Sequence, residues 1–266
     1  LSGRGAQRDV VLEATGAWAA ALQRNDILKS FIARSPHASS QRFFFEGDAS
    51  ARRYEQLVAS DGTHCLLMDM PQRTDGPPVK LGKPYSQIAH LAENITSVVA
   101  INNHLVSLGY SAPKVLQHDL AQGLGLIEPL GSHVYGKMMQ EGVDMREPLE
   151  DAAAVLADMA KHNWPRHPEA AQGINHTVHD YDEDAQLIEV DLLPSWFIPH
   201  ARGLDATDEQ RDEFASVWRK LLPLAKPDSG DRPEATGNGS PLVGGRKWHW
   251  ASYVTRPTMT IYRAKG

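Results

Sequence analysis

The sequence predicts an α+β protein. Three observations support this. Residues 41–71 contain three short apolar runs separated by turn signals, and residues 115–127 contain two more. Between these two groups, residues 86–108 place apolar side chains at helical spacing. Helical patterns dominate from residue 145 to residue 222. The expected order is therefore three strands, a helix, two strands and a helical region.

Bulk composition limits the class of protein. The chain has 266 residues, 41% of them hydrophobic, which is enough for one large or two small domains with a buried core. The net charge of −6 argues against nucleic-acid binding, which requires clustered positive charge. No stretch approaches the ~18 apolar residues that span a bilayer, so we expect no membrane association.

The single cysteine, Cys65, excludes an internal disulfide and favours a reducing cytoplasm. It lies in an apolar run, so we interpret it as a core residue and not as a nucleophile. The chain begins with Leu1 instead of Met, and we therefore expect a fragment or a processed piece. The sequence does not specify an oligomeric state.

Residues 1–40 are interpreted as a lead-in. Residues 8–13 could form a short strand, residues 17–32 carry apolar side chains at helical spacing, and residues 35–40 are rich in Ser and Pro, as in a linker.

The first β region is expected to have strands at 43–45, 54–58 and 64–70. Small residues at 47–50 indicate one turn, and Ser-Asp-Gly-Thr at 60–63 indicates a hairpin.

A Pro/Gly loop at 74–84 precedes one long helix, capped by Ser86 and ended by Gly109. The two further strands are expected at 115–116 and 124–127.

Three helices are expected in the following region. They cover 145–162, 181–197 with a break near Pro194, and a helix that opens with a capping box at 207–210. Residues 229–266 show no sustained periodicity.

Two motifs resemble a known family. G-D-A-S-A-R-R-Y at 47–54, followed by L-M-D-M-P at 67–71, resembles the opening of a bacterial branch of the aminoglycoside-phosphotransferase-like family, which includes N-acetylmuramate and N-acetylglucosamine kinases. Further segments resemble the family in order, at 84–93, 109–116, 126–131 and 181–197. The resemblance covers residues 41–226.

The resemblance implies a protein-kinase-like two-lobe fold. Residues 41–131 would form the N-lobe, an antiparallel sheet plus a helix, and the hinge, and residues 132–228 an incomplete, mainly helical C-lobe. It also implies ATP and Mg²⁺ as cofactors and a small-molecule sugar as phosphate acceptor. The nucleotide-binding candidates are Gly47, Asp48, Ala49, Ser50, Arg52, Arg53, Asp69, Glu93, Glu128 and Leu130.

Small residues at 47–50 would let backbone N–H groups approach phosphates, although the same residues suit an ordinary hairpin turn. Kinases usually carry a phosphate-pairing lysine on the third strand. Here that stretch reads Leu67-Met68-Asp69-Met70, without a lysine, and the resembled branch has the same aspartate. The cation would then come from Arg52, Arg53 or Lys80; all three also suit a solvated surface.

Glu93 would lie on the long helix and orient a cation, unless it is only a solvated carboxylate. Residues 128–130 would offer backbone groups to adenine. The spacing of the histidines in 176–180 is metal-like, but a polar loop is the better interpretation.

The family's catalytic loop, with D-x-x-x-x-N and a second metal-binding aspartate, has no counterpart in residues 227–266. We therefore identify no catalytic or metal-binding residue. One hypothesis is that residues 229–266 are a frame-shifted reading of this region, because codons that encode 254–258 can give His-Ser-Pro-Asn in another frame.

The resemblance thus implies a sugar-kinase-like phosphotransferase, which we expect to be inactive as written because the catalytic loop is absent. The alternative is a non-catalytic nucleotide-binding or interaction module. Residues 8–22 weakly resemble the tail of a fused ATPase subunit of the tRNA threonylcarbamoyladenosine system, which would link the module to that ATPase. A third interpretation is the non-functional product of a disrupted gene.

Overall fold

The computed structural model describes residues 2–45, 52–72, 74–131, 134–225 and 262–263. The chain forms two compact units. The first comprises Leu1–Pro71 with Val115–Pro129, and the second comprises Gln72–Lys114 with Leu130–Gly266. The start of the chain belongs to the same unit as the strands, whereas residues 72–114 belong to the second unit.

The first unit is built on a five-stranded antiparallel sheet with the order β1-β2-β3-β8-β7. The strands are β1 Gln41–Phe45, β2 Arg53–Val58, β3 His64–Asp69, β7 Val115–Asp119 and β8 Leu124–Ile127. All five predicted strands are therefore confirmed. The predicted hairpin between β2 and β3 is also confirmed. There, Gly62 has a φ of 84° and the Asp61 side chain accepts from the Thr63 N–H at 2.9 Å.

A helix, α1 (Ser2–Ala33), leads into this sheet. Its last turns pack on one sheet face, where alternate residues of the strands point toward it. The buried side chains of this core are Leu28, Phe31 and Ile32 of α1 with Leu57, Cys65, Leu67, Leu124 and Leu126 of the sheet. Cys65 is thus a core residue, as predicted, and burial raises the pKa of its thiol to about 11.

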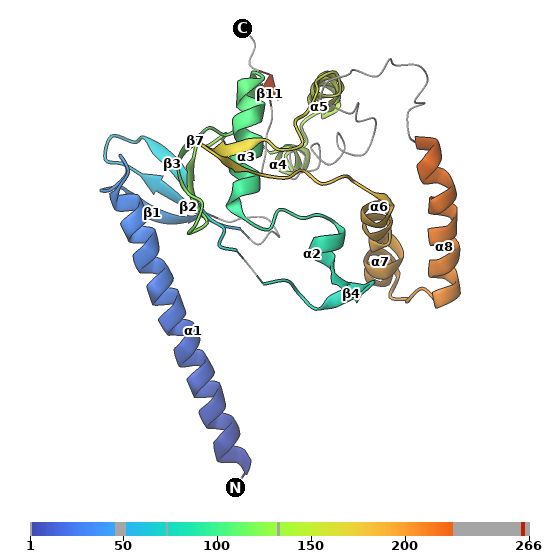
Figure 1. Ribbon diagram of the computed structural model, residues 1–266, viewed down its shortest axis with the longest axis horizontal. Helices are drawn as coiled ribbons and strands as arrows, with labels where there is room; N and C mark the ends of the chain where they lie inside the picture. The colour runs from blue at the N-terminus through green and yellow to red at the C-terminus, as the bar shows by residue number, and fades with distance from the viewer. Residues whose placement is uncertain (1, 46–51, 73, 132–133, 226–261, 264–266) are drawn as a thin grey trace. The chain divides into compact units, whose positions relative to one another are not determined.

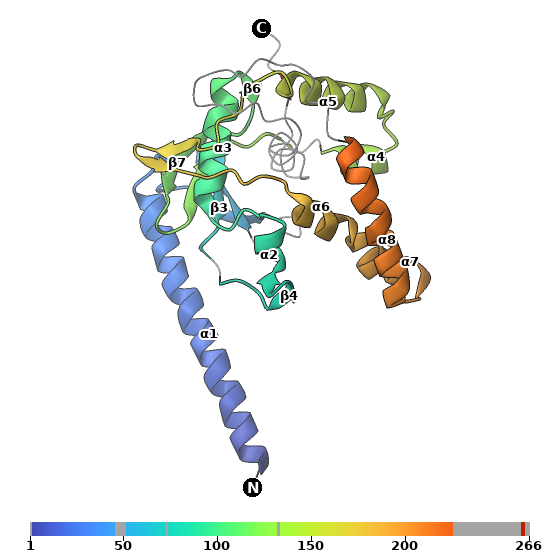
Figure 2. The ribbon, with the colours of Figure 1, turned by 45° about the vertical axis from the view of Figure 1, so that its right-hand side comes forward.

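The strand predicted at residues 8–13 is wrong, because these residues belong to α1. Residues 16–23 of the helix are exposed, and in both views this part of α1 extends away from the sheet (Figure 1 and Figure 2). Arg24 and Asn25 hydrogen-bond to the sheet, Arg24 to Asp69 of β3 and Asn25 to Arg42 of β1.

In the second unit, the single helix predicted from Ser86 to residue 108 is wrong. Two helices occupy this stretch, α2 (Tyr85–Ile88) and α3 (Ile95–Ser107). His90, two residues after α2, adopts a left-handed φ of 49°, so the helix cannot continue through it. Asn94 then caps α3 by accepting from the Thr96 N–H at 3.0 Å. Gly109, with a φ of 82°, follows α3 as predicted.

Ser86 does not cap a helix. Pro84 is the N-cap of α2. The Ser86 hydroxyl instead donates to Asp75 Oδ1 at 2.9 Å, in the segment that leads to β4.

The other elements of this unit are short. They are β4 Pro78–Lys80, β5 Lys83–Pro84, β6 Tyr110–Ser111, α4 Tyr135–Gln140, α5 Arg146–Met159, β9 Glu169–Ala171, β10 Ile174–Asn175, α6 Glu183–Val190, a π-helical turn Leu193–Phe197, α7 Ile198–Arg202, α8 Asp208–Leu221, a 3₁₀ turn Leu222–Ala225 and β11 Tyr262–Arg263. The strands form antiparallel two-stranded ribbons, β4 with β5, β9 with β10 and β6 with β11. One buried cluster joins α3 and α5 and comprises Ile101, Leu105, Tyr110, Ala112, Met159, Trp164 and Val178.

The three helices predicted after residue 145 are confirmed. The middle one changes to a π-helical turn at Pro194, where the break was expected. The capping box of α8 is present, with the Gln210 N–H donating to Thr207 Oγ1 at 3.3 Å and the Thr207 N–H donating to Gln210 Oε1 at 2.9 Å.

Apart from β11, the tail predicted at 229–266 lies outside the described residues. Among the described helices, none is both long enough and apolar enough to cross a membrane. The protein is therefore of mixed α and β structure, with a five-stranded antiparallel sheet and helices, and is compatible with a two-lobe kinase-like fold.

Candidate functional site

Asp69, the last residue of β3, is held by an arginine from α1. Its side chain is only 10% exposed, and both Nε and Nη2 of Arg24 donate to its Oδ1, at 3.1 and 2.6 Å. A buried carboxylate is costly without a partner, and hydrogen bonds between charged groups are roughly twice as strong as neutral ones. Arg24 therefore fixes the end of β3 to α1.

The turn between β7 and β8 holds the same arginine from a second direction. The carbonyl of Gln122 accepts from Arg24 Nη2 at 2.7 Å. The next residue, Gly123, has a φ of 67°, and a Cβ at this position would lie 2.3 Å from the Met70 carbonyl oxygen. Only glycine allows this close approach. The Met70 N–H then donates to the Gly123 carbonyl at 2.8 Å, which anchors the turn beside Asp69.

Arg53, the first residue of β2, lies directly opposite Asp69 in the sheet register. Opposed residues of an antiparallel pair project to the same face, so Arg53 shares the face on which Arg24 meets Asp69. We call Arg24, Arg53, Asp69 and Gln122 the sheet-end cluster. Its charged members are two guanidinium groups and one carboxylate.

A neighbouring arginine is neutralised, in contrast to this cluster. Arg42 of β1 donates from Nε and Nη2 to the two carboxylate oxygens of Glu55, at 2.6 and 2.8 Å, and from Nη1 to Asn25 Oδ1 of α1 at 2.9 Å. The hydrogen bond to Glu55 raises the pKa of Arg42. Arg42 therefore links β1 to β2 through Glu55 and to α1 through Asn25, and its charge is balanced by that of Glu55.

The structure brings only some of the predicted site residues together. Arg53 and Asp69 are neighbours, and Arg52 directly precedes β2. Gly47, Asp48, Ala49 and Ser50 lie outside the described residues. Because β1 ends at Phe45 and β2 begins at Arg53, the connection that contains them leaves and re-enters the sheet at the end that carries Asp69.

Glu128 and Leu130 follow the C-terminal end of β8, whereas Asp69 pairs with Leu124 at its N-terminal end. Both are partly buried, Glu128 in the first unit and Leu130 in the second. The proposed adenine contacts of this segment use backbone groups, so they do not depend on its side chains.

Glu93 belongs to the second unit and is exposed. It lies in the link between α2 and α3, so its predicted place on a helix is wrong. Burial and the nearby Asp75 carboxylate raise its pKa. Lys80 ends the exposed strand β4 in the same unit.

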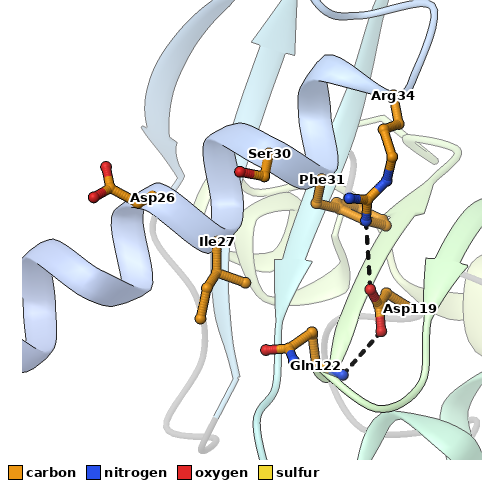
Figure 3. A pocket seen from close by; sticks show the side chains of 7 residues that line it. All are labelled: Asp26, Ile27, Ser30, Phe31, Arg34, Asp119 and Gln122. Atoms are coloured by element: carbon orange, nitrogen blue, oxygen red, sulfur yellow. Dashed lines mark hydrogen bonds and ion pairs between the residues drawn. The ribbon is translucent and has the colours of Figure 1, made fainter.

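A pocket of about 380 Å³ lies where α1 meets the β7–β8 turn (Figure 3). It is lined by Asp26, Ile27, Ser30, Phe31, Arg34, Asp119 and Gln122. Arg34 Nη2 and Asp119 Oδ2 form an ion pair across it at 3.5 Å, and the Gln122 N–H donates to Asp119 Oδ1 at 3.0 Å. Gln122 thus lines the pocket and is also a member of the sheet-end cluster.

The histidines of 176–180 do not assemble a metal centre. In the part of the chain that the structure describes, no group of three or more His, Cys, Asp or Glu side chains could hold a metal ion. Burial lowers the pKa of His176 to about 4, and His179 stacks on His90 with ring centroids 4.8 Å apart.

Sequence reasoning missed Arg24, because the first 40 residues were interpreted as a separate lead-in. A signal was available. Arg24, Leu28 and Phe31 stand at i, i+4 and i+7 and share one helix face. An arginine that becomes largely buried where such a stripe packs on a sheet is normally paired with an acid.

Comparison with known proteins gives related kinases. No family model matches the chain. It is 27% identical over 218 residues to an N-acetylmuramate/N-acetylglucosamine kinase of Caulobacter vibrioides, covering 78% of this chain and 59% of that protein. Kinases of the same name match from Neisseria meningitidis, at 26% identity over 77% of this chain and 54% of that protein, and from Pseudomonas putida, at 27% over 67% and 44%. The chain therefore has homologues named as sugar kinases and spans about half of their length.

Proposed function

We propose that this chain is the nucleotide-binding part of an ATP-dependent sugar kinase of the aminoglycoside-phosphotransferase-like type. One observation carries the proposal. The similarity to the kinase of Caulobacter vibrioides extends over 218 residues. The five-stranded antiparallel sheet with its helices is compatible with that assignment.

The proposed acceptor is a sugar of the N-acetylmuramate or N-acetylglucosamine type, because the similar kinases are named for these compounds. The proposed nucleotide contacts are those predicted from the sequence, with backbone groups of 47–50 on the phosphates and of 128–130 on adenine. Cytoplasm is the proposed location.

We propose further that the chain as written does not transfer phosphate. Phosphoryl transfer in kinases requires a catalytic-loop aspartate and metal-binding Asn and Asp residues, and residues 227–266 contain no such pattern. Mg²⁺ in nucleotide sites is typically held by one or two carboxylates together with phosphate oxygens. Arg24 already occupies Oδ1 of Asp69, so at most Oδ2 of this carboxylate is left for such a role.

Two measurements test this function. Isothermal titration with ATP and Mg²⁺ should show saturable binding, and incubation with ATP, Mg²⁺ and N-acetylmuramate should yield no sugar phosphate. Absence of ATP binding would refute the nucleotide-binding assignment. Phosphate transfer that disappears in an Arg52→Ala variant would refute the predicted inactivity.

A second candidate is a non-catalytic nucleotide-binding or interaction module, favoured by the missing catalytic pattern. The resemblance of residues 8–22 to an ATPase tail would make that ATPase subunit its partner. Added nucleotide should then raise the melting temperature without turnover, and the chain should co-elute with the ATPase subunit in gel filtration. A kinase fragment without this role would bind the nucleotide and elute alone.

A further inference from the structure

We propose that Arg24 supplies the cation that faces the nucleotide phosphates, and that Asp69 is the residue that positions it. This inference rests on the proposed function. It names a residue of α1, outside every motif that resembles the kinase family, as part of the phosphate site.

The first argument is the number of hydrogen-bond donors on Arg24. A guanidinium carries five N–H donors. Arg24 uses Nε and one N–H of Nη2 on Asp69 and a second N–H of Nη2 on the Gln122 carbonyl. Its Nη1 group, on the edge of the plane turned away from the carboxylate, bonds to none of the residues that the structure describes. The side chain is 20% exposed, so it is not sealed off from solvent.

The second argument is charge. Within the sheet-end cluster, Arg24 and Arg53 together carry two positive charges against the single carboxylate of Asp69. The positive charge of Arg42 on β1 is balanced by the carboxylate of Glu55 on β2. Because Asp69 balances the charge of Arg24, the positive charge left over in the cluster corresponds to Arg53, so the cluster as a whole is cationic and would attract an anion.

The third argument explains the acid on β3. Protein kinases carry a lysine on this strand to pair with phosphates. Here β3 ends in a carboxylate that binds a guanidinium from α1, so a cation is still held beside the strand. Arginine stays charged, and the Nη1 group of Arg24 keeps two N–H donors for phosphate oxygens. Asp69 is thus a positioning residue.

The fourth argument is preorganisation. Arg24 is fixed from two sides, by Asp69 on β3 and by the Gln122 carbonyl, and Gly123 is the residue that lets this carbonyl come so close. A side chain already locked in place loses little conformational freedom when a ligand arrives.

The test compares binding of ATP and of adenosine by calorimetry. In the full chain, Arg24→Gln should weaken ATP binding by ~10-fold or more, because a charge-assisted contact is lost. It should leave adenosine affinity unchanged, because adenosine carries no phosphate. Arg34→Gln is the matched control: Arg34 lies on the segment that follows the same helix and pairs with Asp119, and its ATP affinity should equal that of the unmodified protein.

The outcomes separate the two proposals. If the unmodified protein binds neither ligand, the proposed function fails and this inference fails with it. If the unmodified protein binds ATP and Arg24→Gln either leaves ATP affinity intact or weakens ATP and adenosine equally, only the role of Arg24 is overturned. If Arg24→Gln does not fold, Arg24→Lys is the second variant: it keeps the ion pair with Asp69 and replaces the guanidinium by a single ammonium group. It should still bind ATP several-fold more weakly and adenosine equally well.

Discussion

Replacing Phe31 by alanine tests whether α1 is an integral part of the sheet unit. Phe31 is 1% exposed and lies in the core that α1 shares with β2, β3 and β8. Truncating a buried phenylalanine to alanine removes apolar contacts and leaves a cavity, at a cost of about 3–5 kcal/mol. In a unit of this size that loss corresponds to a fall in melting temperature on the order of 20 °C. The Phe31 carbonyl, which accepts from Gln117 Nε2 at 3.2 Å, stays available in the variant.

The assay is urea unfolding followed by far-ultraviolet circular dichroism. Trp18→Ala is the matched control, because Trp18 is on the same helix but 76% exposed. Its free energy of unfolding should change by less than about 0.5 kcal/mol. A loss below about 1 kcal/mol for Phe31→Ala, equal to that of the control, would show that α1 does not stabilise the sheet.

Two further predictions concern the backbone and pH. Gly123→Ala should cost at least about 2 kcal/mol, because it adds a collision with the Met70 carbonyl to left-handed strain, whereas Gly62→Ala, with open space around it, should cost only about 1 kcal/mol; equal losses in thermal unfolding would contradict the collision. Because burial lowers the pKa of His176 from 6.5 to about 4, the unfolded chain takes up a proton that the folded chain does not. Stability should be complete above pH 6.5 and decline as the pH falls toward 4, by roughly 1–2 kcal/mol after allowance for solvent screening. His176→Gln should flatten this decline, and an unchanged pH profile would refute the assignment.

Local signals predicted the sheet well. The strands β2 and β3 follow from alternating or continuous apolar runs joined at Asp61-Gly62, a turn whose backbone conformation is encoded in those two residues. The capping box of α8 was likewise readable, since its two hydrogen bonds join residues three apart.

The failures occurred where local signals compete. Apolar spacing from 86 to 108 suits one helix, but the left-handed His90 and the cap at Asn94 divide it. The strand expected at 8–13 is wrong because these residues continue α1, whose last turns pack on the sheet.

The candidate site shows the same division. Asp69 and Arg53 could be singled out from a motif, and the pairing of β2 with β3 followed from the hairpin. Their surroundings could not be predicted. Arg24 is 45 residues from Asp69 and Gln122 is 98 residues from Arg24, and no local pattern relates such positions.

The sequence by itself determined the five strands of the main sheet, the three helices after residue 145, the core position of Cys65 and the motif that contains Asp69, because each depends on side-chain periodicity or on residues a few positions apart. Only the tertiary structure decided that α1 belongs to the sheet unit and that the acid of β3 holds an arginine. Both depend on the burial of charge and apolar surface between distant segments, and that free energy is gained only when the whole unit folds.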